Sequence, residues 1–257
     1  MNGSYAVGID AGSAYTKGVL LRGETLVAFR ILPSGANHCQ AAERILRELL
    51  DRVNLGQEQL HKIVATGLGA GRIHFAHARV AEITALSRGV DKTCPTVKTI
   101  IDVGAAASRI IKLDENGCPL DIVSNEKCAT GSGRFLQIVA RVLRIGLDEI
   151  GPLSLQSQKP VNFSVGCAVF AESEVITLLA EGTRREDILA GVHRALAAKI
   201  MTMVGSLKRT GDIGIIGGAA RNSGFVRCLE DGFQVKLLVP ENPQVVAALG
   251  AALTAGE

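Results

Sequence analysis

Residues 5–17 read Tyr-Ala-Val-Gly-Ile-Asp-Ala-Gly-Ser-Ala-Tyr-Thr-Lys, and this stretch carries the pattern that decides the fold. A short apolar run ending in aspartate indicates a β-strand with a carboxylate at its end. The pattern returns in residues 97–109, Val-Lys-Thr-Ile-Ile-Asp-Val-Gly-Ala-Ala-Ala-Ser-Arg. Aspartate, glycine, hydroxyl residue and cation stand at identical offsets in copies 92 residues apart: Asp10, Gly12, Thr16 and Lys17, then Asp102, Gly104, Ser108 and Arg109. The sequence therefore predicts a duplicated strand–turn–strand unit.

Signals for a hairpin and then for helices follow each copy. Asn116-Gly117 separates two apolar runs after the second copy, and Gly23 does so after the first. Asn-Gly between apolar runs is a strong hairpin signal. Segments with apolar residues at helical spacing come next, at 38–53, 132–145 and 185–209. Strands that alternate with helices predict an α/β fold.

The glycine turns are candidates for binding phosphate. A third such turn, Gly217-Gly218, follows a predicted strand at 213–216. Backbone N–H groups in an Asp-x-Gly turn can point at an anion, small residues let a phosphate approach, and the carboxylate can hold Mg²⁺ through water. Two turns in register and a third downstream predict a three-part nucleotide site. Two common nucleotide motifs are excluded, because the chain has no G-x-x-x-x-G-K-[ST] and the glycine run 67–71 is not G-x-G-x-x-G.

Composition is that of an ordinary soluble protein. With 257 residues and 47% hydrophobic residues, the chain can bury one or two domain cores. No apolar run approaches the length of a membrane span, and the N-terminus lacks a signal-peptide pattern. No basic block suggests a nucleic-acid partner, and the net charge of +3 says little about partners. We expect a cytoplasmic protein that binds neither membrane nor nucleic acid.

The six cysteines form no C-x-x-C pair, so the sequence gives no support for a zinc ribbon or a thioredoxin site. In a reducing cytoplasm, scattered cysteines are usually small buried hydrophobes. That interpretation suits four of them: Cys39, Cys94, Cys118 and Cys228. Cys128 and Cys167 fit it less well, because each precedes a helical stretch and Cys128 is close to two glycines.

At this point the residues resemble a known family. The run Gly8–Ser13 followed by Lys17 resembles the first phosphate loop of the actin/Hsp70/sugar-kinase superfamily. Residues 125–136 and 167–175, around the two cysteines, resemble activators of 2-hydroxyacyl-CoA dehydratases, which are BadF/BadG/BcrA/BcrD-type ATPases. That family also includes the ATPase subunits of benzoyl-CoA reductase. The resemblance covers nearly the whole chain, and the two cysteine motifs are its most specific part.

The resemblance implies a duplicated ribonuclease-H-like, actin-like ATPase fold with an interdomain nucleotide cleft between its halves. The halves would be 1–95 and 96–257, with a C-terminal helix at 244–255 packing back on the first half. ATP phosphates would lie on glycines and a serine, with Lys17 contacting phosphate and Gln244 as a further contact. Asp10 and Asp102 would be catalytic, organising Mg²⁺ and the attacking water. The phosphate-binding residues would be Gly12, Ser13, Gly104, Gly217 and Gly218.

The resemblance also implies a homodimer with one [4Fe–4S] cluster at the dimer interface, held by Cys128 and Cys167 of each subunit. A cubane cluster needs four thiolates, and two suitable cysteines per chain make four only in a dimer. Thiols at helix N-termini also have a lowered pKa. The electron donor would be a ferredoxin or flavodoxin. The acceptor would be a CoA-ester dehydratase or reductase, or another iron–sulfur enzyme.

The second turn departs from the family pattern, in which Asp-Ile-Gly-Gly-Gln-Asp is followed by a lysine. Here the turn contains Ala105-Ala106-Ala107, and Arg109 takes the place of the lysine. Three functions stay open. The first is an electron-activating ATPase. The second is a nucleotide-binding subunit of a benzoyl-CoA-reductase-like complex, which would pair as a heterodimer and have weak hydrolysis of its own. The third is a small-molecule kinase of the amino-sugar type without iron.

Overall fold

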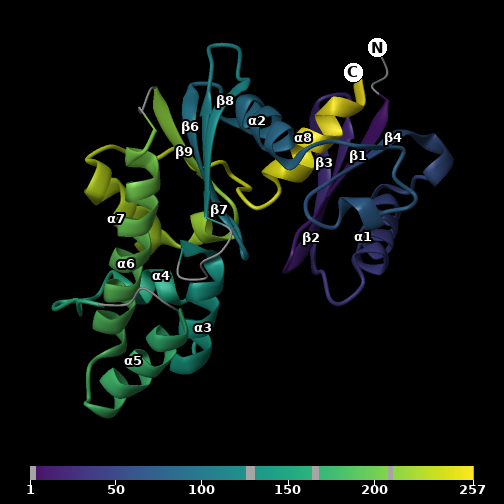
Figure 1. Ribbon diagram of the computed structural model, residues 1–257. Coiled ribbons are helices and arrows are strands. Elements are labelled where there is room, and N and C mark those ends of the chain that lie inside the picture. The colour runs from purple at the N-terminus through teal and green to yellow at the C-terminus, as the bar shows by residue number, and fades with distance from the viewer. Residues whose placement is uncertain (1–3, 126–130, 164–167, 208–210, 257) are drawn as a thin grey trace. The chain divides into compact units, whose positions relative to one another are not determined.

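The computed structural model describes residues 4–125, 131–163, 168–207 and 211–256 (Figure 1). Contacts divide the chain into two compact units. Unit 1 comprises residues 1–97, 113–119 and 240–257, and unit 2 comprises residues 98–112 and 120–239. The chain therefore leaves unit 1 and returns to it, and each unit is described by itself.

Unit 1 is built on a five-stranded mixed sheet of order β3-β2-β1-β4-β5. The first three strands are antiparallel neighbours, and β4 runs parallel to β1. Three helices pack on this sheet or on each other. The elements are β1 (Tyr5–Ala11), β2 (Tyr15–Arg22), β3 (Thr25–Pro33), α1 (His38–Val53), β4 (Leu60–Thr66), β5 (Ala78–Arg79), α2 (Glu82–Thr93) and α8 (Val246–Leu253).

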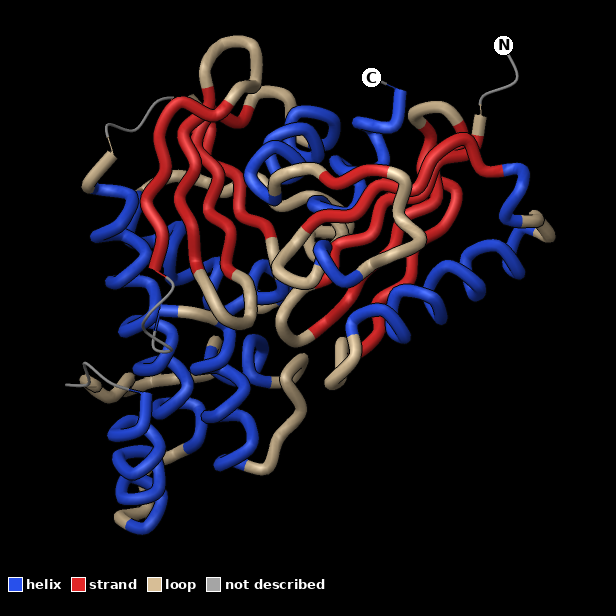
Figure 2. The backbone as a smooth tube through the Cα atoms, turned by 45° about the vertical axis from the view of Figure 1, so that its right-hand side comes forward, coloured by secondary structure: helices blue, strands red, loops and turns tan. Residues whose placement is uncertain are grey.

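Side chains of β1 alternate between two faces of the sheet, as strand geometry requires. Val7 and Ile9 belong to the cluster that contains Ile45 and Leu49 of α1. The opposite face is covered by α8, which also packs on α2 (Figure 2). Gly8 is essential there, because a Cβ at this position would collide with the α8 backbone at Ala248. The absence of a side chain lets helix and strand backbones approach closely.

Unit 2 is built on a four-stranded sheet of order β8-β7-β6-β9, with β6 and β7 antiparallel. Buried strand residues such as Ile101 and Ile110 pack against helices of the same unit in one hydrophobic cluster. The elements are β6 (Val97–Val103), β7 (Ser108–Leu113), β8 (Pro119–Asn125), α3 (Gly133–Leu143), α4 (Ile150–Ser154), α5 (Ala168–Ala180), α6 (Arg185–Gly205), β9 (Asp212–Ile216) and α7 (Ser223–Phe233).

Helix α6 is the central core helix of unit 2. It is the one described helix long and apolar enough to cross a membrane, yet 56% of its apolar stretch is buried inside the protein. Its buried side chains include Ile188, Val192, Leu196 and Ile200.

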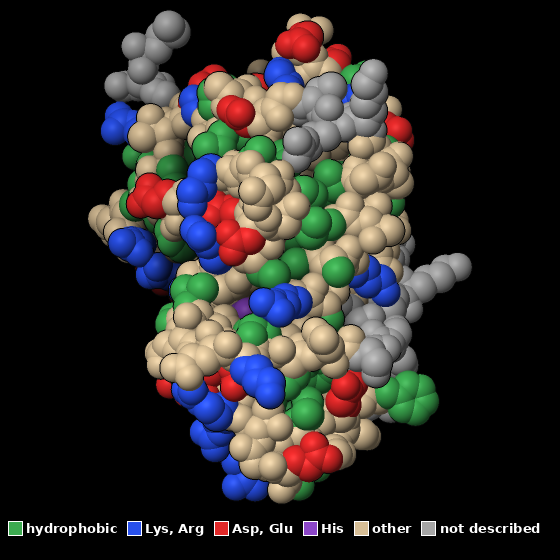
Figure 3. All heavy atoms as spheres, turned by 90° about the vertical axis from the view of Figure 1, so that its left-hand side faces the viewer, with side chains coloured by type: hydrophobic (Ala, Val, Ile, Leu, Met, Phe, Trp, Pro, Cys, Tyr) green, Lys and Arg blue, Asp and Glu red, His purple; other side chains and the backbone are tan. Residues whose placement is uncertain are grey.

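The face in Figure 3 carries cationic and anionic side chains scattered among apolar and polar ones, so charge of one sign is not gathered on that face.

A buried histidine of α6 links three helices of unit 2. His193 Nδ1 lies 2.9 Å from Ser154 Oγ, and the Ser154 hydroxyl donates to Gly151 O of α4. The hydroxyl therefore accepts from Nδ1–H, and Nε2 accepts from the Asn222 side-chain amide at 2.8 Å. Asn222 in turn caps α7 by accepting from the Phe225 N–H. Burial lowers the pKa of His193 to about 3, so the ring is neutral at physiological pH.

The predicted α/β fold with two strand–turn–strand copies is confirmed. Both copies form antiparallel pairs, and the predicted helix at 38–53 is α1 with those bounds. The predicted segments 132–145 and 185–209 correspond to α3 and α6. The hairpin at Asn116-Gly117 is present, with Gly117 at φ 76° in the turn between β7 and β8.

Candidate functional site

The first candidate turn joins β1 to β2. Asp10 pairs with Lys17 in the strand register, and the turn is closed by the Gly12 N–H donating to Tyr15 O at 3.2 Å. The Lys17 ammonium lies 2.8 Å from Asp10 Oδ2, and Asp10 is only 4% exposed. The ion pair with Lys17 holds the Asp10 carboxylate in one orientation.

The other carboxylate oxygen of Asp10 is buried and has no hydrogen-bond partner. It lies beside the backbone of Gly67, whose φ of 85° is open to glycine but strained for other residues. The loop from Gly67 is held against the first turn by the Gly69 N–H donating to Ala11 O at 2.8 Å. A buried anionic oxygen without a partner is costly. Its chemistry suits a water molecule of a hydrated Mg²⁺ ion.

Hydroxyl groups close the first turn from the sheet side. Thr16 Oγ1 and Ser34 Oγ lie 2.9 Å apart, and Ser34 Oγ donates to Gly12 O at 2.7 Å. Ser34 follows the end of β3, so the carbonyl of the turn is satisfied within the sheet of unit 1. No local sequence pattern marks Ser34 or Gly67 as parts of this turn, because both reach it from other segments.

The second candidate turn, residues 104–107, joins β6 to β7 in the same register. Asp102 pairs with Arg109, Val103 pairs with Ser108, and the Gly104 N–H donates to Ala107 O at 3.0 Å. Arg109 Nη1 lies 3.5 Å from Asp102 Oδ2, which is a longer contact than the one in the first turn. Asp102 is 7% exposed. The two carboxylates thus occupy equivalent, buried strand-end positions in their units.

The third turn lies against the end of β6. Gly217 has φ 87°, and a Cβ on it would lie 2.5 Å from Val103 O and 3.0 Å from Asp102 Oδ1. Only glycine allows this approach at this dihedral angle. Gly218 begins a short 3₁₀ helix, Gly218–Arg221. Asp102, Gly104 and Gly217 therefore meet at one edge of the unit 2 sheet.

The comparisons with known proteins agree with this geometry. A model described as the BadF/BadG/BcrA/BcrD ATPase family matches residues 7–255. The chain belongs to this family.

Two solved structures are similar over nearly the full length of this family member. The activator of the 2-hydroxyisocaproyl-CoA dehydratase from Clostridium difficile, solved with bound ADPNP, is 39% identical, with a TM-score of 0.94 and coverage of 98% of this chain and 94% of that one. Component A of the Acidaminococcus fermentans (R)-2-hydroxyglutaryl-CoA dehydratase is 33% identical, with a TM-score of 0.93 and coverage of 98% and 99%.

A more distant structure shares the fold alone. A ROK family glucokinase from Streptomyces griseus is 13% identical, with a TM-score of 0.55 over 96% of this chain and 98% of that one. The architecture is that of actin-like ATPases, as the sequence predicted.

The other predicted site residues of this family member are placed as follows. Ser13 is exposed in the first turn, Gly218 is exposed after β9, and Gln244 is half-buried just before α8. Cys128 and Cys167 lie outside the described residues. α3 begins at Gly133, and α5 begins directly after Cys167. Among the described residues, no group of three or more His, Cys, Asp or Glu side chains could hold a metal ion.

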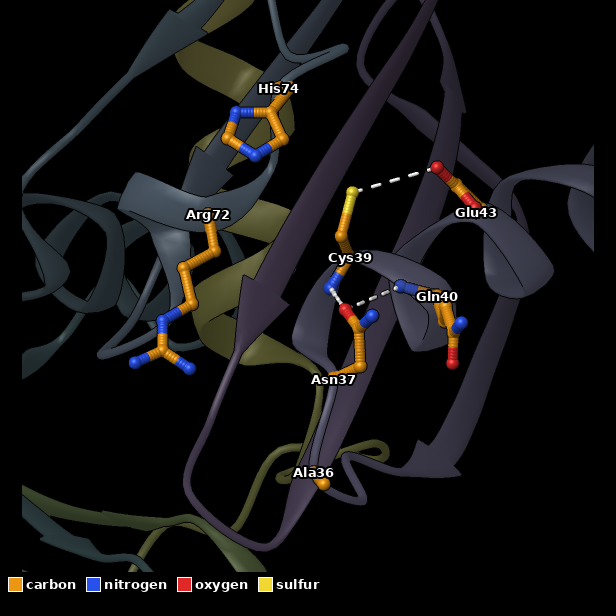
Figure 4. A pocket seen from close by; sticks show the side chains of 7 residues that line it. All are labelled: Ala36, Asn37, Cys39, Gln40, Glu43, Arg72 and His74. Carbon is orange, nitrogen blue, oxygen red and sulfur yellow. Dashed lines mark hydrogen bonds between the residues drawn. The ribbon is translucent and has the colours of Figure 1, made fainter.

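One recess in unit 1 lies apart from these turns (Figure 4). Three of its lining residues contact each other at the start of α1. Asn37 Oδ1 accepts from the N–H groups of Cys39 and Gln40 and so caps α1. The Cys39 thiol contacts Glu43 at 3.6 Å. These contacts assign Asn37, Cys39 and Glu43 to the structure of the helix start, and we assign no chemistry to the recess.

Proposed function

We propose that this protein is an ATP-dependent activator that transfers a low-potential electron to a partner iron–sulfur enzyme, such as a 2-hydroxyacyl-CoA dehydratase. The electron would come from a [4Fe–4S] cluster held between two copies of the chain by Cys128 and Cys167 of each. A ferredoxin or flavodoxin would reduce the protein in the cytoplasm.

One observation carries the proposal: the match, over nearly the full length, to a dehydratase activator that binds ADPNP, at 39% identity and a TM-score of 0.94. The turn geometry supports the nucleotide part independently. Two buried carboxylates stand at equivalent strand ends, each beside a cation and a glycine turn. Nothing of this kind is needed for packing alone, because the unpartnered oxygen of Asp10 destabilises the folded state without a ligand.

In the proposed roles, Gly12, Ser13, Gly104, Gly217 and Gly218 hold phosphate oxygens through backbone N–H groups and close approach. Lys17 contacts phosphate, and Gln244 makes a further contact with the nucleotide. Asp10 and Asp102 hold hydrated Mg²⁺ and the attacking water, so that negative charge is neutralised where it develops.

The cysteines would supply four thiolates only if two chains associate. Cys167 is followed directly by α5, whose N-terminal dipole would favour an anionic thiolate there. Such a cluster would supply a low-potential electron when bound.

A specific observation favours a second candidate within the same family. The second turn offers three alanine side chains where a water-positioning group would stand, and the Arg109–Asp102 contact is long at 3.5 Å. The chain would then be the nucleotide-binding subunit of a benzoyl-CoA-reductase-like complex, with weak hydrolysis of its own and a second ATPase subunit as its partner.

The test is iron and acid-labile sulfide content, with solution mass, on anaerobically purified protein. We expect about four irons per dimer, lost in Cys128→Ala and in Cys167→Ala. Cys118→Ala is the matched control. The expectation that Cys118 is buried was wrong: this cysteine is exposed in the turn before β8, and its replacement should leave iron unchanged. Iron-free protein that binds ATP and phosphorylates an amino sugar would refute the electron-transfer proposal.

Phosphate release by the iron-loaded protein separates the two candidates. Multiple turnovers without another subunit support the activator. Tight ADPNP binding with turnover only after a second ATPase subunit is added supports the subunit of a larger complex.

A further inference from the structure

The second turn is hydrogen-bonded to the beginning of α3. The Gly133 N–H donates to Gly104 O at 2.8 Å, and the Arg134 N–H donates to Ala105 O at 3.1 Å. Gly133 is close-packed as well, since a Cβ on it would lie 3.1 Å from Gly104 O. The phosphate turn and the helix start therefore contact each other backbone to backbone.

These two hydrogen bonds cap the N-terminus of α3. The first N–H groups of any α-helix have no partner within the helix and need one from outside. Ser132 occupies the N-cap position but makes no side-chain capping bond. The carbonyls of Gly104 and Ala105 take that role, so a turn that rearranges removes the cap from α3.

A buried hydroxyl adds a third connection. Ser108, the first residue of β7, has no exposed surface, and its Oγ donates to Gly131 O. Gly131 is buried as well, and a Cβ there would collide with the side-chain amide of Asn125. Ser108 is thus anchored in the strand that leaves the turn and holds the segment that enters α3.

We propose that Ser108 is a positioning residue that couples the 104–107 turn to residues 131–134. A change in the turn between its ATP-bound and ADP-bound forms is passed through the three hydrogen bonds to the start of α3, which Cys128 precedes in the chain. The proposal rests on the proposed function in one respect, that the turn binds nucleotide phosphate. Beyond that function, it identifies the hydrogen bonds through which residues 131–134 respond to a change in the 104–107 turn.

Short, satisfied backbone hydrogen bonds resist independent movement of the segments that they join. Displacing the turn while α3 stays in place would break two N–H···O bonds and bury unpaired groups. Moving both together breaks none. Ser108 makes the coupling stronger, because Gly131 O would otherwise be a buried acceptor without this donor.

The experiment is amide hydrogen exchange on the full-length, anaerobically purified protein with Mg-ADPNP and with Mg-ADP. In the wild type we expect the two nucleotides to give different exchange rates in peptides covering 98–107 and 131–143. In Ser108→Ala the ratio of the exchange rates with the two nucleotides should persist in the first peptide. In the second peptide this ratio should fall by about fivefold, which corresponds to losing one ordinary hydrogen bond.

Ser206→Ala is the matched control. Its Oγ also donates to a backbone carbonyl of unit 2, Met203 O at the end of α6, so it should leave both differences unchanged. Gly133→Ala loosens the same junction from the helix side and should reproduce the effect of Ser108→Ala, which keeps the test valid if one variant folds poorly.

An unchanged difference over 131–143 in folded Ser108→Ala and Gly133→Ala would overturn the coupling. So would a wild type whose response stops at the turn. Failure of the proposed function has other signatures. Protein that lacks iron but shows the coupled response loses electron transfer and keeps the coupling, whereas protein that binds neither nucleotide refutes both.

Discussion

The two strand–turn–strand copies have the same register but satisfy their carbonyl groups differently. In the first turn, Gly12 O accepts from Ser34 Oγ, which contacts Thr16 and follows the end of β3. In the second turn, Gly104 O accepts from Gly133 N–H, and Ser108 donates to Gly131. Thr16 and Ser108 stand at the same offset. The hydroxyl at this offset contacts Ser34, which bonds the turn, in unit 1, and it bonds the segment that enters a helix in unit 2.

The charged pairs differ as well. Lys17 lies 2.8 Å from Asp10, and Arg109 lies 3.5 Å from Asp102. Asp10 also has a buried oxygen without a partner. A duplicated pattern therefore need not give two equivalent half-sites: the first turn is the better candidate for holding a metal ion, and the second is hydrogen-bonded to the start of a helix.

The largest expected effect tests this asymmetry directly. Asp10→Asn should lower kcat for MgATP hydrolysis by about 100-fold, the scale seen when one preorganised charge-stabilising group is removed. Asp102→Asn should lower it less. Phosphate release measures the effect, and calorimetric ADPNP binding shows whether the variants still bind nucleotide. Equal losses would mean that the two carboxylates share the metal ion evenly.

Acid should weaken unit 2 more than unit 1. The pKa of His193 is about 3 in the folded state and 6.5 in the unfolded chain. Between these pH values the unfolded chain therefore binds a proton that the folded protein does not bind. Stability from the neutral histidine is therefore complete above pH 6.5 and falls as the pH drops, by about 2 kcal/mol at pH 5.

Amide exchange between pH 7 and 5, corrected for intrinsic rates, measures this loss in α6 and α7 separately from α1 and α8. The variant His193→Gln cannot take up the proton and should show a flat profile in α6 over this range. If wild-type α6 and α1 lose protection in parallel, the histidine network is not the cause.

Alanine at the turn glycines should distinguish the two copies. A Cβ on Gly12 would lie 2.8 Å from Tyr15 O, whereas one on Gly104 would lie 3.3 Å from Ala107 O. Gly12→Ala should therefore destabilise unit 1 by roughly 1–2 kcal/mol and Gly104→Ala should cost unit 2 less than about 1 kcal/mol. Urea unfolding followed by unit-specific amide exchange measures both, and the reverse order would contradict the predicted difference.

The smallest effects concern the ends of helices. Asn54 after α1, Arg144 after α3 and Gln234 after α7 all have φ between 53° and 55°. Glycine costs less than other residues in this left-handed conformation, and asparagine is tolerated there. Arg144→Gly and Gln234→Gly should each stabilise unit 2 by about 0.5 kcal/mol, and Asn54→Gly should change unit 1 by less. Thermal melts of the single variants test this ranking.

Much of the fold could be predicted from short-range patterns. The strand ending at Asp10 and its repeat at Asp102 are visible as apolar runs with fixed offsets, and α1 shows a clear helical spacing of apolar residues. The partners of the turns could not be predicted in this way. Ser34, Gly67 and Gly133 reach the turns from distant parts of the chain, and only the folded backbone brings them there.

The candidate site shows the same division. Aspartate, lysine and glycine at the first turn could be identified because their chemistry and spacing are local. The sequence pattern also marked Ser108, but not its acceptor, because a hydroxyl group in a strand can donate to many carbonyls. The sequence could not show that Asp10 keeps one buried oxygen without a protein partner, because that depends on the packing of the Gly67 loop.

The packing of α8 on β1 has a consequence for how the protein is made. Ribosomes release the strands of unit 1 first and α8 only after all residues of unit 2. Until α8 emerges, the sheet face around Gly8 has no helix to cover it, while unit 2 already has its complete sequence. Unit 2 can therefore complete its fold before unit 1 does, and the apolar sheet face that α8 covers stays open until that helix has been synthesised.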